Sequence, residues 1–245
     1  MIPRIIHQSW KVAQIPDRWT AFQKSWRDHH PHYEYRLWTD EDNRAFVAEH
    51  FPELLSLYDG YHLPINRADL VRYLVVCRYG GIYVDLDFEA LRPLDGLLEG
   101  KSLMFGLEPE SHLARPAVRA RGFTRLVCNA IFASVPRHSF WEHFVPMLVA
   151  AKDGPTVLDV AGPFVLTQAC DSYPDQDAIS IVPASLLYPI DNYGGQVNGE
   201  ERSGAGEPPY AVHHWAGTWW REALLSNARR RILAARSANE TTPGP

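Results

Sequence analysis

The stretch PINRADLVRYLVVCRYGGIYVDLD, residues 64–87, decides the fold of this chain. Pro64 stands where a helix accepts proline in its first turn, apolar residues follow it at helical spacing, and Gly80 is placed to cap the C-terminus. The second half, GGIYVDLD, has the apolar character of a buried strand, and its two glycines permit a sharp turn before that strand. The stretch therefore predicts a helix over residues 64–79 that turns directly into a strand.

Two carboxylates stand at the end of this predicted strand. Because side chains alternate along a strand, Tyr83, Asp85 and Asp87 are expected on one face, with Ile82 and Val84 on the other. Adjacent carboxylates repel each other unless a proton or a cation lies between them, and Mn²⁺ and Mg²⁺ prefer oxygen ligands. The pattern favours a divalent metal site that also binds a diphosphate, although an isolated DxD is short enough to be only a solvated turn.

The helix before the carboxylates contains a second pair of charges. Asp69 and Arg72 are three residues apart, so they share one stripe of a helix that is otherwise mostly apolar. Such a pair either forms part of a binding site or locks the helix against the neighbouring strand. In both cases the double glycine directs the two aspartates of the strand toward the same cleft as this pair.

Segments with strand and helix character alternate along the rest of the chain. Strands are expected over residues 4–6, 33–38, 102–108, 129–134 and 179–182 and at a segment ending at 213–215, and helices over residues 18–29, 40–51, 140–152, 163–170 and 222–237. This alternation predicts an α/β sheet flanked by helices. A single domain is expected over residues 1–237, followed by a frayed tail over 238–245, with residues 194–209 as a candidate lid.

Composition narrows the function classes. The chain has 245 residues, is 46% hydrophobic and has a formal net charge of -5, which gives no electrostatic reason to expect a nucleic-acid partner. Its three cysteines, Cys77, Cys128 and Cys170, fit neither a disulfide framework nor a CxxC metal site. No signal-peptide pattern opens the sequence, and no apolar run reaches the ~18 residues of a membrane span. A cytoplasmic location without a transmembrane segment is therefore expected.

The segment ADLVRYLVVCRYGGIYVDLD resembles the signature of the DXD-containing sugar transferases of glycosyltransferase family 32. That family includes fungal initiating mannosyltransferases, and its core resembles that of the large clostridial glucosylating toxins. Further similar segments are IPRIIHQSW (2–10), NAIFASVPRHSFW (129–141), AGPFVLT (161–167) and HHWAGTWW (213–220). The resemblance covers about residues 1–220. It implies a Rossmann-like GT-A fold with a single, mixed and mostly parallel sheet, in which residues 1–100 mainly bind the nucleotide-sugar and residues 101–220 mainly form the acceptor side.

The resemblance also implies roles for the charged residues already described. Asp87 would ligate the metal directly, while Asp85 would contact the ribose, or the metal through water. Asp69 and Arg72 would bind hydroxyls of the donor sugar, and Asn129 would lie near the reacting carbon. For Asn129, a strand-end amide that satisfies a turn is the alternative.

Aromatic and histidine residues complete the implied site. His7 and Trp10 stand where the family's IPxxIHxxW motif places the nucleotide-base pocket, with Trp10 stacking on the base or, alternatively, packing in the core. One of the adjacent histidines, with His214 favoured over His213, would reach the metal or the diphosphate. Trp220, like its neighbour Trp219, would cover the diphosphate or hold the final helix to the body.

The function implied is a metal-dependent, retaining transfer of a hexosyl group from a UDP- or GDP-sugar to a hydroxyl acceptor, in polysaccharide or glycolipid assembly or on a small molecule. Mn²⁺ or Mg²⁺ is the expected cofactor. Glu108 and Glu110, which follow a predicted strand, remain candidate nucleophiles or bases. Arg229, Arg230 and Arg231 lie on the predicted terminal helix, which would contact an anionic membrane surface at the periphery or expose an ordinary solvated face.

Two other function classes share part of this pattern. A phosphatase of the haloacid dehalogenase type also has an apolar strand ending in DLD, but that motif requires other residues where this chain has Phe88 and Glu89. A non-catalytic nucleotide-sugar-binding module would retain the pocket without turnover. The intact pair of aspartates argues against it, and hydrolysis of the donor would discriminate among the three.

Overall fold

The computed structural model describes residues 1–192 and 207–217. Met1–Trp215 forms one compact unit, and Ala216–Pro245 forms a second unit that falls almost wholly outside the described residues. The predicted terminal helix, the tail, Trp220 and most of the candidate lid therefore lie outside the described part of the chain. The expectation of a single domain through residue 237 stays a prediction for the same reason.

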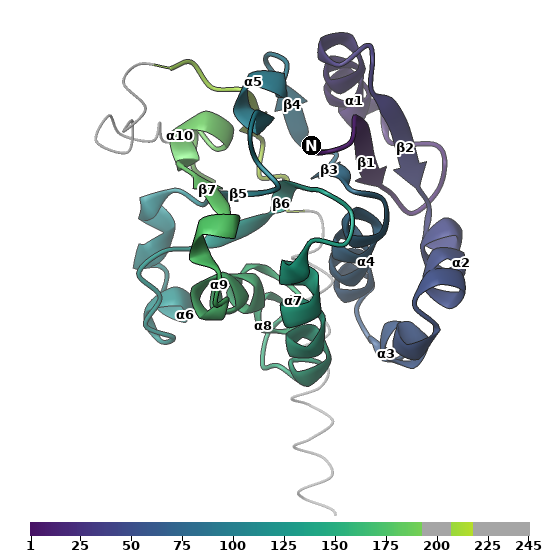
Figure 1. The fold of residues 1–245 in the computed structure, drawn as a ribbon, viewed down its shortest axis with the longest axis vertical. Coiled ribbons are helices and arrows are strands. Elements are labelled where there is room, and N and C mark those ends of the chain that lie inside the picture. The colour runs from purple at the N-terminus through teal and green to yellow at the C-terminus, as the bar shows by residue number, and fades with distance from the viewer. Residues whose placement is uncertain (193–206, 218–245) are drawn as a thin grey trace, which may run out of the picture. The chain divides into compact units, whose positions relative to one another are not determined.

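A six-stranded sheet organises the compact unit (Figure 1). Its strands are β1 (Ile5–Ser9), β2 (Glu34–Trp38), β3 (Gly81–Val84), β5 (Leu103–Leu107), β6 (Val127–Ser134) and β7 (Ser180–Val182). They lie in the order β2-β1-β3-β6-β5-β7. Strand β1 runs parallel to β2 and β3, and β5 runs parallel to β7, while β6 is antiparallel to both of its neighbours. The expected mixed, mostly parallel α/β sheet is confirmed.

A small second sheet lies beside the first. It pairs β4 (Phe88–Ala90) with β8 (Ala211–His213) in antiparallel register, so that Phe88 lies opposite His213. The two strands are 121 residues apart in sequence from the end of β4 to the start of β8, counted as 211 minus 90. The pairing therefore brings the end of the described chain back to the segment that follows β3.

Helices cover both faces of the main sheet (Figure 1). They are α1 (Asp17–His29), α2 (Asp40–His50), α3 (Leu55–Gly60), α4 (Pro64–Tyr79), α5 (Asp95–Leu98), α6 (Pro116–Arg119), α7 (Ser139–Ala150), α8 (Val157–Val160), α9 (Pro163–Ser172) and α10 (Ala184–Leu187). Short 3-10 turns occupy Pro52–Leu54, Glu110–Ala114 and Gln176–Ala178. The predicted elements within the described chain are present, with ends shifted by a few residues. The N-cap of α2 is Thr39 rather than Asp40, the N-cap that the sequence favours, because the Thr39 hydroxyl accepts from the N–H of Asp42.

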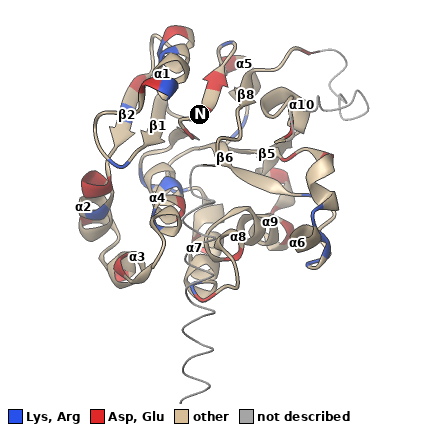
Figure 2. Ribbon diagram, turned by 180° about the vertical axis from the view of Figure 1, so that it is seen from behind, with Lys and Arg blue, Asp and Glu red and all other residues tan. Residues whose placement is uncertain are grey.

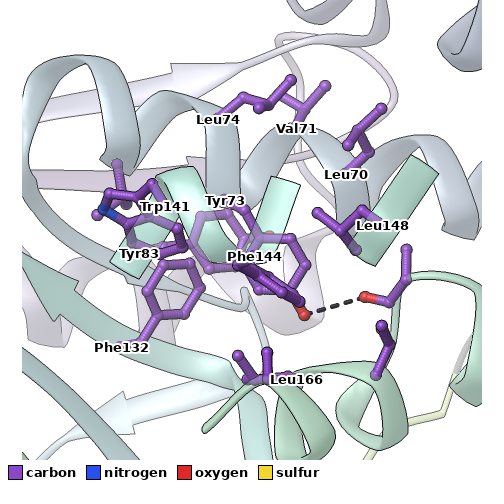
Figure 3. Packing of buried hydrophobic residues seen from close by; sticks show 14 of the residues in the cluster. Leu70, Val71, Tyr73, Leu74, Tyr83, Phe132, Trp141, Phe144, Leu148 and Leu166 are labelled. Carbon is purple, nitrogen blue, oxygen red and sulfur yellow. Dashed lines mark hydrogen bonds between the residues drawn. The ribbon is translucent and has the colours of Figure 1, made fainter. Parts of the chain in front are cut away.

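Two hydrophobic cores lie on the two faces of the sheet. One contains Tyr83 and Phe132 from the strands, with Tyr73 of α4 and Trp141 and Phe144 of α7 packed on them (Figure 3). The other contains the alternate strand residues together with α1, α5 and α10. The alternation predicted for the strand after the double glycine is thus confirmed as far as Val84.

The join between α4 and β3 explains why two glycines stand together. Gly80, the C-cap of α4, has a φ of 68°, and Gly81 has a φ of 95°. A side chain on Gly81 would bring its Cβ within 2.5 Å of the main-chain oxygen of Ile5 on the neighbouring strand. Glycine is therefore required for the backbone conformation and for the close approach of β1, and the helix keeps the predicted bounds.

Charged residues are distributed over several elements of the surface (Figure 2). Exposed ion pairs such as that of Arg44 and Asp59, 2.8 Å apart, contribute little to stability because solvent screens them. Within residues 1–192 and 207–217, no helix combines the length and apolar character needed to span a bilayer.

Candidate active site

The two carboxylates lie in a turn that follows β3. The strand ends at Val84, and the N–H of Phe88 donates to the carbonyl oxygen of Asp85 at 3.1 Å, which closes a turn before β4 begins. The predicted continuous strand through Asp87 is therefore wrong in extent. The turn nevertheless brings the Asp85 and Asp87 carboxylates close together. The end of the turn is held by the residue after β8, since the N–H of His214 donates to the carbonyl oxygen of Asp87 at 2.9 Å.

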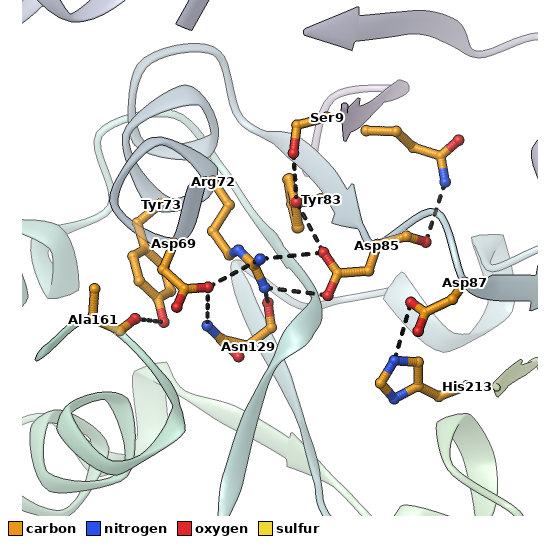
Figure 4. Close-up of polar contacts among 11 residues, drawn as sticks. Ser9, Asp69, Arg72, Tyr73, Tyr83, Asp85, Asp87, Asn129, Ala161 and His213 are labelled. Carbon is orange, nitrogen blue, oxygen red and sulfur yellow. Dashed lines mark hydrogen bonds and ion pairs between the residues drawn. The ribbon is translucent and has the colours of Figure 1, made fainter. Parts of the chain in front are cut away.

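Three side chains around this turn offer metal-ligating atoms. Ligand atoms of Asp85, Asp87 and His213 all lie within 4.8 Å of one another. The Nε2 atom of His213 is 3.2 Å from Oδ1 of Asp87 (Figure 4). The His213 ring stacks on Phe88 at a centroid distance of 4.6 Å. The stacking follows from the β4–β8 register and fixes the imidazole beside the carboxylates.

The histidine beside the carboxylates is His213, which corrects the preference for His214. The two adjacent histidines face opposite ways, with His213 buried and His214 exposed. His214 instead stacks on Phe22 of α1 at 4.2 Å, and its Nε2 atom is 3.1 Å from Oε2 of Glu89. The pairing register of β4 with β8 determines which histidine lies beside the carboxylates. His213 is opposite Phe88, so the two side chains lie on the same face of the small sheet.

A buried charge network joins α4 to the turn. The guanidinium of Arg72 is 3.0 Å from Oδ1 of Asp69, and its two terminal nitrogens each lie 3.3 Å from an oxygen of Asp85 (Figure 4). Only 5% of the Arg72 side chain and 6% of the Asp69 side chain is exposed. Asn129 of β6 completes the network. Its side-chain amide donates to Asp69 at 3.0 Å, and its main-chain carbonyl accepts from Arg72 at 3.0 Å. The structure thus brings together the four residues Asp69, Arg72, Asp85 and Asn129 that the sequence singled out.

Sequence reasoning missed two residues that support Asp85. The hydroxyl of Tyr83 donates to Oδ1 of Asp85 at 2.9 Å and lies 3.0 Å from the hydroxyl of Ser9 on β1. Arg72 also lies over the Tyr83 ring, with its guanidinium carbon 4.9 Å from the centroid. The alternation of side chains along the strand, which places Tyr83 on the same face as Asp85, could have indicated the contact of Tyr83 with Asp85. No pattern in the sequence around Ser9 indicates its contact with Tyr83.

Negative charge exceeds positive charge in this cluster. Burial raises the pKa of Asp69 to about 7, against the opposing charge of Arg72. Burial also raises the pKa of Asp85, again opposed by Arg72, and the charge of Asp87 raises it further. Arg72 can balance only one of the three carboxylates, and a divalent cation would supply the positive charge that lets the others ionise despite their burial.

His7 lies behind the site and has a structural role. It is fully buried, its Nε2–H donates to the carbonyl oxygen of Gly80 at 2.9 Å, and its Nδ1 accepts from the indole N–H of Trp38 at 3.1 Å. Both ring nitrogens are therefore occupied inside the protein, and a contact of His7 with the nucleotide stays a prediction. Trp10 follows β1, is half-buried, and donates its main-chain N–H to Trp38 at 2.9 Å. Its proposed stacking on a base stays a prediction.

The burial of His7 predicts a pH-dependent stability. Burial lowers the pKa of His7 from 6.5 to about 4. Between these values the unfolded chain binds a proton that the folded chain does not, so the free energy of unfolding falls as the pH drops from 6.5 toward 4, by about 3 kcal/mol in total for this group. Urea unfolding of the protein and of His7→Gln at pH 7 and pH 5 measures the effect. We expect the variant to lose less stability between the two pH values, and equal losses would contradict the assignment.

Of the two other candidate carboxylates, Glu110 lies in the first turn of Glu110–Ala114 and its role stays a prediction, whereas Glu108 is engaged elsewhere. Oε2 of Glu108 is 2.7 Å from Nδ1 of His112 and 3.5 Å from the guanidinium of Arg115, and its side chain is 5% exposed. Its charge is therefore paired by groups of the protein itself, which disfavours Glu108 as a nucleophile.

Comparisons with known proteins agree with this geometry. Residues 16–104 match the family described as a glycosyltransferase sugar-binding region containing a DXD motif. Inositol phosphoceramide mannosyltransferase 3 of Schizosaccharomyces pombe is 37% identical over 221 residues, which cover 88% of this chain and 60% of that protein. Mannosyl phosphorylinositol ceramide synthase SUR1 of Saccharomyces cerevisiae is 36% identical over 173 residues, covering 65% of this chain and 41% of that protein. The chain thus spans less than two thirds of the length of these relatives.

Among solved structures, the bifunctional glycosyltransferase WbbM in its apo form superimposes with a TM-score of 0.52. The match covers 88% of this chain and 46% of that one at 11% identity. At this identity the likeness concerns the fold alone.

Proposed function

Because this chain belongs to glycosyltransferase family 32, whose sugar-binding region contains a DXD motif, we propose that it transfers a hexosyl group from a UDP- or GDP-sugar to a hydroxyl group of an acceptor. The observation that carries the proposal is the pairing of Asp69 and Asp85 with the single guanidinium of Arg72, with Asp87 placed beside Asp85 after the end of β3. Such an excess of negative charge at the carboxyl edge of a sheet suits a site that binds a diphosphate together with a divalent cation.

The residues present fit Mn²⁺ or Mg²⁺. Asp87, Asp85 and His213 would hold the ion, because carboxylate oxygens are the preferred ligands of both metals and an imidazole is an accepted ligand of Mn²⁺. When bound, such an ion neutralises charge that develops on the departing diphosphate. The bond between His213 and Asp87 orients both groups in its absence.

Asp69, Arg72 and Asn129 would orient the transferred sugar. A carboxylate accepts hydrogen bonds from sugar hydroxyls and a guanidinium donates them. Asp69 and Arg72 together could therefore bind two neighbouring hydroxyls, one acting as donor and the other as acceptor. The fixed fork of the guanidinium then determines which hydroxyl geometry is accepted.

We infer that the anomeric configuration is retained. Asp69 already pairs with Arg72 and Asn129, and Glu108 pairs with His112, so neither carboxylate is poised as a nucleophile. The acceptor oxygen would attack the anomeric carbon from the side on which the bond to the diphosphate breaks. The acceptor proton passes to the departing diphosphate oxygen, which balances the step without a protein base.

The names of the relatives support a proposal for the sugar and the acceptor. Several are named as inositol phosphoceramide mannosyltransferases, and we propose that this chain likewise transfers a mannosyl group to a hydroxyl of a glycolipid head group. A hydroxyl acceptor at a lipid surface is also compatible with a protein that contacts the membrane only at its periphery.

Release of the nucleoside diphosphate tests the proposal. We expect GDP-mannose with Mn²⁺ and an inositol-containing glycolipid to give the highest turnover in a panel that includes UDP-glucose and UDP-galactose. EDTA should abolish it, because the like charges of the carboxylates and the diphosphate then face each other. Full turnover in EDTA would refute the requirement for a metal ion. Binding of the nucleotide-sugar without release of the nucleoside diphosphate would indicate a non-catalytic module, and hydrolysis of phosphate monoesters alone would indicate a phosphatase.

A further inference from the structure

Gln8 is a polar side chain in the interior of the sheet, in the middle of β1. It is fully buried, and its amide nitrogen donates to the main-chain carbonyl of Asp85 at 3.3 Å. Its amide oxygen accepts from the hydroxyl of Tyr35 on β2. A buried primary amide is costly unless its two ends are bonded, and here one end is bonded to the DXD turn.

Helix α1 fixes the orientation of this amide through Tyr35. The amide of Gln23 donates to the Tyr35 hydroxyl at 2.8 Å, and the Arg27 guanidinium lies 4.2 Å from the centroid of its ring. Burial raises the pKa of Tyr35 to about 12, so the hydroxyl keeps its proton at neutral pH. Since that proton points at the oxygen of Gln8, the amide N–H must point at Asp85.

The same helix holds the segment after the turn. The indole N–H of Trp26 donates to the carbonyl of Phe88 at 2.9 Å, and the N–H of Ala90 donates to the hydroxyl of Ser25 at 2.9 Å. The turn is therefore tied to α1 on both sides, directly after Asp87 and, through Gln8, at Asp85. All three bonds of this tie are made to main-chain atoms of the turn and of the segment after it.

We propose that Gln8 is a positioning residue for the acidic cluster, setting the distance between Asp85 and Asp87 through the main-chain carbonyl of Asp85. This carbonyl fixes the peptide plane that leads from Asp85 toward Asp87, and a rotation of that plane moves the second carboxylate relative to the first. The inference rests on the proposed function, in which the two carboxylates hold a divalent cation. A site of this kind needs its supporting bonds, because displacement of a ligand by about 1 Å weakens binding and slows the reaction.

Gln8 and Tyr35 form a hydrogen-bonded relay that ends at the main-chain carbonyl of Asp85, and substitutions in this relay test the role of Gln8. Gln8→Met keeps the length of the side chain and removes both hydrogen bonds, so we expect Mn²⁺ to bind about 10-fold more weakly and kcat/KM to fall about 10- to 100-fold. Tyr35→Phe removes only the anchor of the Gln8 amide, and a loss of about 3-fold in both quantities is expected. Mn²⁺ affinity is measured by calorimetry without donor, and melting temperature is recorded for each protein.

Tyr173→Phe is the matched control. Its hydroxyl lies 2.6 Å from the hydroxyl of Ser139, which joins α9 to α7, and the substitution removes one tyrosine hydrogen bond that does not lead to the turn. Mn²⁺ affinity that falls in Gln8→Met and Tyr35→Phe but not in Tyr173→Phe supports the proposal. Affinity equal to that of Tyr173→Phe in both relay variants overturns it, and Tyr35→Phe decides the question alone if Gln8→Met does not fold. A native protein that binds no Mn²⁺ overturns the metal site itself, which is a distinguishable result.

Discussion

Asp87→Asn is expected to lower kcat/KM about 10²- to 10³-fold and to weaken Mn²⁺ binding strongly, with little change in stability. The Asp87 side chain is 16% exposed and its Oδ1 lies 3.2 Å from Nε2 of His213, so an amide of the same shape fits the turn. What the amide lacks is the charge that would hold a divalent cation. Asp85→Asn should cost less in metal affinity, because the charge of Asp85 is already paired with Arg72.

Nucleoside diphosphate release and calorimetric titration with Mn²⁺ check this expectation. Asp153→Asn is the matched control, since Asp153 is exposed on the loop after α7 and the change in charge is the same. It should leave both quantities unchanged. Equal and small losses of kcat/KM and of Mn²⁺ affinity in Asp87→Asn and Asp85→Asn would contradict a metal ion bound by these two carboxylates.

The sequence was most informative where structure depends on neighbours along the chain. Helix α4 begins and ends where Pro64 and Gly80 predict, because both residues act on the backbone of their own turn. The spacing of Asp69 and Arg72 follows from the period of that same helix. These local rules suffice to predict a helix, a turn and a strand, and with them most of the acidic cluster.

Prediction was wrong where the outcome depends on pairing between distant segments. The inward histidine is His213 because β8 pairs with β4, and no local pattern specifies that register. The same pairing is why the chain turns at Asp85 instead of continuing β3. The burial of His7 and Gln8 likewise depends on partners contributed by other elements, which no local pattern specifies.

Replacement of Arg72 is expected to have the largest effect on stability. Arg72→Met leaves Asp69 and Asp85 without their common partner inside the protein, and breaking such a buried pair lowers the free energy of unfolding by about 3–5 kcal/mol. Arg72→Lys should be intermediate, because an ammonium cannot contact both carboxylates in the manner of the guanidinium fork. Urea unfolding measures both. Losses under about 1 kcal/mol would mean that solvent already screens the network.

Asp69→Asn separates the stability of the network from recognition of the sugar. Burial raises the pKa of Asp69 to about 7, so its ionised form is costly in the folded protein, and a neutral amide of the same shape should leave the melting temperature near normal. The amide still accepts a hydrogen bond but lacks the charge that strengthens bonds to sugar hydroxyls, each of which contributes about 1.5–3 kcal/mol. We therefore expect transfer to slow about 10- to 100-fold, with nucleotide binding retained and a changed preference among donors that differ at one hydroxyl. A lower melting temperature with unchanged donor preference would show instead that Asp69 serves only to hold α4 against the turn.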